Sequence, residues 1–172
     1  MSKSYVSEAM REAVGRRLRL QVSYPVSESD IRKWALAVYY PRAPPQEFID
    51  PDYARGRRWG GIVAPQEFNP FNWVCACSEG IEPPAQADAP DRTEIMLGIE
   101  PPHLHFQLNG GLETEYGEPM RPGDVITSIS RLAGYYEREG RLGRMLFTLT
   151  EDIWTNQRGE FVKRTLSTGI RY

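Results

Sequence analysis

The chain has 172 residues, of which 40% are hydrophobic and 26% are charged, and its formal net charge is −2 at pH 7. This length predicts one domain with its own core, and the nearly neutral charge argues against a nucleic-acid or anionic-membrane partner. No apolar run approaches the roughly 20 residues of a membrane span, and the first residues lack the apolar core of a secretory signal. We therefore expect a single cytoplasmic domain over residues 1–172.

The metal-binding residue types are few. The only cysteines are Cys75 and Cys77, and a lone Cys-x-Cys without a second pair is a weak metal signal. We expect two thiols on a buried helix and no bound metal or other cofactor. The only histidines, His103 and His105, alternate on a predicted strand and would share one face. A structural or surface role for them competes with a catalytic or metal-binding one.

The N-terminal part alternates between helix and strand patterns. Residues 5–15 carry apolar side chains at helical spacing, and residues 18–22 alternate apolar with polar side chains as in a half-buried strand. Ser27 precedes Asp30 by three positions, a capping pattern that predicts the start of a helix. Pro41 ends that helix because proline has no backbone N–H and clashes with the preceding turn.

The middle of the chain is rich in proline. Residues 41–51 predict an ordered loop, after which Asp50 caps a short helix that runs to about Arg55. Near Pro65 we expect a long and mainly apolar helix containing Phe68, Phe71, Val74 and Cys75, and a helix that is apolar on most sides is buried. Residues 80–102 predict a long Pro-rich surface loop.

Strand patterns dominate from His103 to the end. Apolar residues alternate with others around Leu104 to Tyr116, and a Pro122-Gly123 turn follows. Three more extended segments end at Tyr172, with a hairpin turn at residues 156–159. The stretch 109–124, NGGLETEYGEPMRPGD, opens this series of consecutive strands. An antiparallel sheet wrapped around the long helix buries both, so we predict an α+β hot-dog domain.

Four segments together resemble the N-terminal, FAS1-like half of the MaoC-like dehydratases. They are VSESDIRKWALAV, GGIVAPQEF, LNGGLETEYGEPMRPGD and TNQRGEFVKRTLSTGIRY, and their order and spacing carry the resemblance from about residue 12 onward. The family implies hydration or dehydration at the 2,3 bond of an acyl thioester. In a segment like D-x-N-P-x-H-x-D, an Asp and a His position water and move the proton, while backbone N–H groups hold the thioester oxygen.

The segment that should carry this pair departs from the family pattern. In VYYPRAPPQEFIDPDYA, alignment on Asp50 and Ala54 puts Phe48 at the catalytic His position and Ala43 at the catalytic Asp position. Phenylalanine cannot shuttle a proton, so we expect no catalytic residue here. The non-catalytic subunits of the heteromeric dehydratases show the same loss, and there a partner hot-dog subunit supplies the Asp and the His.

Several residues are candidates for binding an acyl thioester. Gly60 and Gly61 would let the ligand lie against the chain, or would simply form a loop with positive φ. Ala64 would lie at a helix start, where N–H groups face a thioester oxygen. Asn109 would touch the ligand or cap a bulge at Gly110.

Charged groups offer further candidates. Arg57 and Arg58, with Arg55, would meet the phosphates of CoA, or would be solvated. Glu113 and Glu115 share a strand face, which we expect to be solvated rather than catalytic.

Three functions remain open at this point. The chain is a substrate-binding, non-catalytic subunit of a heteromeric (R)-specific enoyl-CoA hydratase or 3-hydroxyacyl thioester dehydratase. Alternatively, it is a homodimeric hydratase or thioesterase that uses Asp50 or Glu67, or a non-enzymatic acyl-CoA-binding protein. Because the edge of a hot-dog sheet pairs with another subunit, we also expect a dimer or a dimer of dimers.

Overall fold

The computed structural model describes residues 4–71, 89–141 and 143–172. Within these ranges the elements follow one another as α1 (Glu8–Glu12), β1 (Arg17–Val22), α2 (Glu28–Tyr39), a 3₁₀ turn (Gln46–Phe48), α3 (Pro51–Arg55), α4 (Arg92–Leu97), β2 (Gln107–Tyr116), β3 (Ile126–Gly140), β4 (Gly143–Asn156) and β5 (Phe161–Arg171). No helix in this part of the chain is long and apolar enough to cross a membrane.

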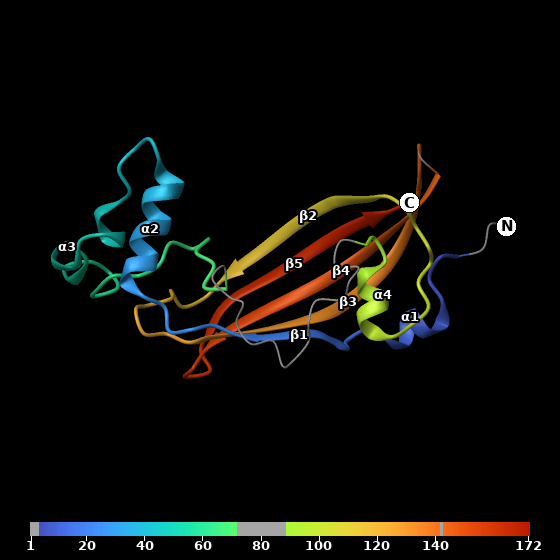
Figure 1. Ribbon diagram of the computed structural model, residues 1–172, viewed down its shortest axis with the longest axis horizontal. Coiled ribbons are helices and arrows are strands. Elements are labelled where there is room, and N and C mark those ends of the chain that lie inside the picture. The colour runs from blue at the N-terminus through green and yellow to red at the C-terminus, as the bar shows by residue number, and fades with distance from the viewer. Residues whose placement is uncertain (1–3, 72–88, 142) are drawn as a thin grey trace.

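The strands form one twisted antiparallel sheet in the order β1-β3-β4-β5-β2 (Figure 1). Strands β3, β4 and β5 are consecutive, as the sequence predicts. Strand β2 instead pairs with β5 at one edge, so the stretch 109–124 crosses the sheet rather than turning directly back onto β3. Helices α2 and α3 lie beyond one end of the sheet, and α1 and α4 lie at the other end (Figure 1).

The predicted bulge in β2 is confirmed. The register shifts between Asn109 and Gly111, whose φ of 141° is a conformation that favours glycine. At Gly110 a β-carbon would lie only 2.7 Å from Cγ1 of Ile170 on β5. Both glycines are therefore required by the backbone, one for its conformation and one for its close approach.

The Pro-Gly-Asp turn is held by a buried carboxylate. Asp124 is 2% exposed, and its Oδ2 accepts a hydrogen bond from the backbone N–H of Arg121 at 2.8 Å. Its Oδ1 accepts from Nη1 of Arg158 at 3.0 Å and from Nε2 of Gln157 at 3.2 Å. One residue thus joins the turn before β3 to the β4–β5 hairpin.

The two predicted helix caps are both present. Oγ of Ser27 accepts from the backbone N–H of Asp30 at 3.0 Å, and α2 ends before Pro41. Oδ1 of Asp50 accepts from the N–H groups of Asp52 and Tyr53 at 2.9 and 3.1 Å and so opens α3. Both helices pack into the largest core cluster through buried side chains such as those of Ile31 and Ala54.

Helix α4 was not predicted, because it lies in the segment 80–102 that we expected to be a Pro-rich surface loop. Its Glu94 is fully buried and accepts two hydrogen bonds from Arg171 of β5, at 2.7 and 2.8 Å. Nη1 of Arg171 also donates to Asp91 at 2.8 Å, and the hydroxyl of Tyr135 donates to Glu94 at 2.7 Å. This paired charge network binds α4 to the sheet. Residues 80–88 of the expected loop lie outside the described residues.

Two further expectations need correction. The described part of the helix expected near Pro65, residues 65–71, forms turns, and its remainder, with both cysteines, lies outside the described residues. The histidines do not share a strand face, because β2 begins after them at Gln107 and His103 has a φ of 58°. His103 pairs instead with the exposed Glu100, with Nε2 2.9 Å from Oε1.

Candidate functional site

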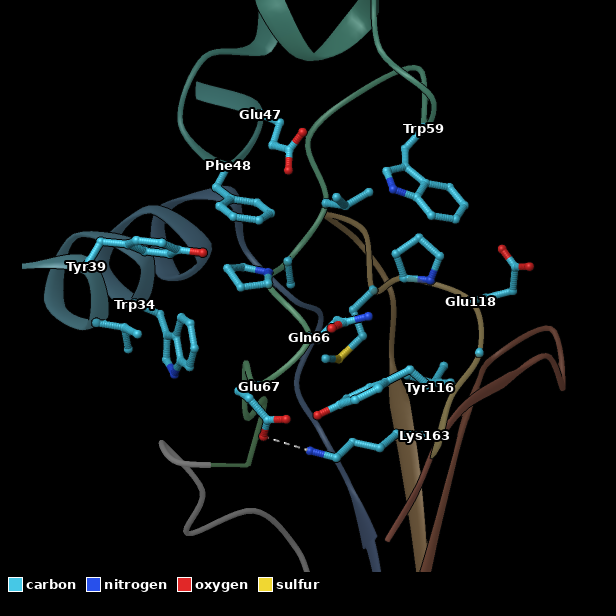
Figure 2. Close-up of a pocket in the computed structure, with 18 residues that line it drawn as sticks. Trp34, Tyr39, Glu47, Phe48, Trp59, Gln66, Glu67, Tyr116, Glu118 and Lys163 are labelled. Carbon is cyan, nitrogen blue, oxygen red and sulfur yellow. Dashed lines mark hydrogen bonds and ion pairs between the residues drawn. The ribbon is translucent and has the colours of Figure 1, made fainter. Parts of the chain in front are cut away.

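The candidate site is a pocket of about 490 Å³ between α2, the segment 62–68 and the end of the sheet that carries Tyr116 and Val162. Figure 2 shows aromatic side chains on both of its sides, with Trp34, Tyr39 and Phe48 facing Trp59 across it. Met120, Val63 and Val162 complete the apolar lining. A pocket of this size and composition is suited to a hydrocarbon ligand.

Phe48 forms part of the pocket wall. The 3₁₀ turn before α3 directs its ring inward, where it is 9% exposed and lies 6.3 Å from the ring of Tyr39. Ala43, the other position expected to carry catalytic chemistry, is exposed and does not line the pocket. Neither His103 nor His105 lines it.

One ion pair lies at the polar end of the pocket. Nζ of Lys163 donates to Oε2 of Glu67 at 3.3 Å (Figure 2). The ammonium also lies 5.5 Å from the ring centroid of Tyr116 and 5.1 Å from that of Trp154. Such contacts stabilise a cation that has little access to water.

The segment before Phe68 supplies backbone groups rather than a helix start. The N–H of Ala64 donates to the carbonyl of Met120 at 2.8 Å, so it is not free for a ligand. Pro65 has no N–H, and its carbonyl accepts from the N–H of Phe68 at 2.9 Å, which closes a turn. Among the described residues, the intervening N–H groups of Gln66 and Glu67 have no acceptor, and both residues line the pocket.

Of the five predicted substrate-binding residues, only Ala64 lines this pocket. Gly60 and Gly61 lie in the loop just before it, where Gly60 has a φ of 68°. Asn109 lines a separate hollow of about 660 Å³ near α4, and Gly110 lies beside it in the bulge. From the sequence we placed these residues in one site, because each glycine pair by itself indicates a close approach to the backbone. In the structure the two pairs lie in different parts of the fold.

The predicted phosphate-binding arginines are exposed and lie close to aromatic rings. The guanidinium of Arg57 is 4.2 Å from the ring centroid of Tyr53, and that of Arg58 is 4.4 Å from Trp59, which lines the pocket. Arg58 is therefore near the pocket, and the binding of CoA phosphates by either residue stays a prediction.

The remaining candidates divide between surface and pocket. Asp50 is used as the cap of α3, while Glu113 and Glu115 are exposed on β2. No cluster of three or more metal-ligand residues occurs in the ranges that the structure describes. Of the two alternative catalytic carboxylates, Asp50 and Glu67, Glu67 lines the pocket, as Glu47 and Glu118 also do.

Sequence reasoning missed Lys163 and Tyr116 as site residues. Lys163 neighbours the buried Val162 on β5 and is itself 8% exposed, so no alternation of buried and exposed side chains marks it. Its ammonium contacts Tyr116 and Glu67, which are both distant in the sequence.

The chain belongs to the family described as FAS1-like, dehydratase domain region. The match covers residues 12–165. The hot-dog fold expected from the sequence is thereby confirmed. No curated protein sequence matches the chain.

Solved structures of the same fold include a MaoC-like dehydratase from Rhodospirillum rubrum, with 20% identity, a TM-score of 0.58, and coverage of 93% of this chain and 92% of that one. The ChsH1–ChsH2 complex from Mycobacterium tuberculosis shares 17% identity, with a TM-score of 0.68 and coverage of 94% and 86%. The HadBC (3R-hydroxyacyl-ACP dehydratase) complex from the same organism shares 17% identity, with a TM-score of 0.57 and coverage of 89% and 96%.

Proposed function

We propose that this chain is the substrate-binding, non-catalytic subunit of a heteromeric (R)-specific enoyl-CoA hydratase or 3-hydroxyacyl thioester dehydratase. It binds the acyl part of a CoA or acyl-carrier-protein thioester, and a MaoC-like partner subunit supplies the catalytic Asp and His. The reaction adds water to the 2,3 double bond of the enoyl thioester, or removes it.

The observation that carries this proposal is the ring of Phe48 in the pocket wall. It stands where the family resemblance expects the catalytic His, and a phenyl ring neither accepts nor donates a proton. The apolar lining suits an acyl chain, and the backbone N–H groups of Gln66 and Glu67, for which no acceptor is found among the described residues, are candidates for holding a thioester oxygen.

A partner subunit is supported by the edge of the sheet. Strand β2 is an edge strand of ten residues and is exposed over most of its length, including Leu108 at 50% and Leu112 at 64%. Such an edge invites pairing with another strand. Two of the similar structures, ChsH1–ChsH2 and HadBC, are complexes.

A second candidate is a hydratase that works without a different partner chain. It is favoured by Glu67, a carboxylate that lines the pocket and is a candidate general base. The two candidates predict different hydration activities for the purified chain alone: none for the first and turnover for the second.

The test measures crotonyl-CoA and octenoyl-CoA hydration by the purified chain, together with the binding of octanoyl-CoA by calorimetry. We expect binding without turnover. Turnover by the chain alone that is abolished in Glu67→Gln would instead establish the second candidate, and failure to bind any acyl-CoA or acyl-carrier-protein thioester would exclude both.

A further inference from the structure

Lys163 is a buried cation with few partners. Its side chain is 10% exposed, and its ammonium lies over the rings of both Tyr116 and Trp154. An ammonium has three hydrogen-bond donors, and Glu67 is the one hydrogen-bond acceptor found for it among the described residues. A buried charge needs a hydrogen-bonded counterion, so this position favours an oxygen acceptor.

Glu67 is an incomplete counterion. Its side chain is 59% exposed and its oxygen lies 3.3 Å from Nζ, which is long for a charge-assisted hydrogen bond. Its backbone belongs to a turn rather than to a helix or strand. The carboxylate can therefore move into solvent at little cost, whereas Lys163 is held by its contacts with the rings of Tyr116 and Trp154.

The pair lies on the border between two hollows. Glu67 and Lys163 line the apolar pocket of about 490 Å³ and also a neighbouring hollow of about 480 Å³. Polar side chains, including those of Gln21, Ser128 and Thr165, line this second hollow. Lys163 thus marks the point where an apolar environment changes to a polar one.

We propose that Lys163 anchors an oxygen of the bound acyl thioester, and that Glu67 is the counterion that this oxygen replaces on binding. This inference rests on the proposed function and adds the group that orients the ligand. The hydrocarbon occupies the side lined by Trp34, Phe48 and Trp59. The oxygen at Lys163 is either the thioester carbonyl or a carboxylate carried by the acyl chain.

The exchange makes predictions of opposite sign for the two members of one ion pair. Lys163→Met removes the anchor and should weaken ligand binding by about tenfold or more, since a charge-assisted hydrogen bond in a buried site is lost. Glu67→Gln removes the competitor and should tighten binding by about three- to tenfold. In the Lys163→Met background, Glu67→Gln should change nothing, because there is no cation left to release.

The experiment is calorimetric titration of the full-length chain and its variants with octanoyl-CoA and with octanedioyl-CoA. Lys33→Met and Glu113→Gln are matched controls for the loss of one charge, because both residues are exposed and line neither hollow. Thermal unfolding checks that each variant is folded. If Lys163→Met does not fold, the tightening in Glu67→Gln still tests the exchange.

The result identifies the oxygen as well. If Lys163→Met weakens and Glu67→Gln tightens the binding of both ligands, Lys163 holds the thioester carbonyl. If the two substitutions have these effects on octanedioyl-CoA alone, Lys163 holds the carboxylate of the acyl chain. Unchanged affinity in Lys163→Met and Glu67→Gln for both ligands would overturn the inference while leaving the proposed function intact. An increase in affinity caused by Glu67→Gln that persists in the Lys163→Met background would overturn the inference too. Absence of binding by the wild-type chain would overturn both the inference and the proposed function.

Discussion

At the scale of single residues, Phe48 has a role in stability as well as in the pocket. Its side chain packs into the main core cluster together with Ile31 and Ala54. Truncation leaves a cavity that the fixed 3₁₀ turn and α3 cannot close. The ring that lines the pocket therefore also supports the fold around it.

Phe48→Ala should lower the free energy of unfolding by about 2–4 kcal/mol. Tyr40→Ala is the control, because Tyr40 is 82% exposed, and its removal should cost less than about 0.5 kcal/mol. Urea unfolding of both variants measures the difference. Equal stability of the two variants would mean that Phe48 is not packed as described.

Asp152 gives a pH-dependent prediction. Burial raises the pKa of its carboxyl group, against the lowering by a hydrogen bond from Ser130 and by the charge of Arg19. Its Oδ1 is buried and has no hydrogen-bond partner. A carboxyl whose folded pKa is raised contributes stability below its unfolded pKa, and this contribution is lost as the pH rises through the folded pKa.

Asp152→Asn should therefore stabilise the protein at pH 7 and have little effect at acid pH, where the native carboxyl is already neutral. The expected rise in Tm at pH 7 is roughly 2–4 °C, which corresponds to about 1 kcal/mol in a domain of this size. Differential scanning calorimetry of both proteins between pH 3.5 and 8 measures it. A difference that grows towards low pH would contradict the assigned environment.

At the scale of elements, local sequence signals found the caps and turns but not the pairing of β2 and β5. Ser27, Asp50 and the hairpin at 156–159 act within a few residues, so their chemistry is legible in the sequence. The neighbour of β2 is set by contacts with residues between 47 (Tyr116–Lys163) and 64 (Gln107–Arg171) positions away. Hence the sequence predicted consecutive pairing, and the structure has a crossover.

The missed helix α4 has the same origin. Its charged side chains indicate a solvated segment, and only the distant Arg171 turns Glu94 into a buried ion-pair partner. Lys163 and Glu67 are likewise far apart in the chain, which is why the ion pair at the polar end of the pocket was not predicted. The family resemblance singled out Phe48 as the residue at the expected catalytic His position, but not as part of a pocket wall.

The bulge in β2 offers a test of the β2–β5 contact. Gly110→Ala should cost about 1–3 kcal/mol, because the new methyl group would overlap the side chain of Ile170. Gly134→Ala is the matched control, since a β-carbon there meets nothing within 4 Å. Denaturant unfolding compares the two. Ile170→Ala, which removes both Cγ1 and Cδ1, should cost less stability in the Gly110→Ala background than in the wild type, and equal costs would argue against this contact.

At the scale of the whole molecule, we expect the partner subunit to pair with β2, one of the two edge strands of the sheet. Leu108→Lys combined with Leu112→Lys should abolish pairing with another hot-dog subunit while leaving Tm within a few degrees, because both side chains are exposed. Leu36→Lys on α2, where the side chain is 55% exposed, is the control. Light scattering of the chain with and without its partner reports the mass. If Leu36→Lys abolishes association and the β2 substitutions do not, the interface lies on α2 instead.

The most direct measurement is crotonyl-CoA and octenoyl-CoA hydration by this chain, by a MaoC-like partner with an intact Asp–His pair, and by their mixture. The account predicts activity with octenoyl-CoA only in the mixture, and its loss when the partner's catalytic His is replaced by Ala. Activity of this chain alone, or activity of the mixture that survives the loss of the partner's His, would contradict it.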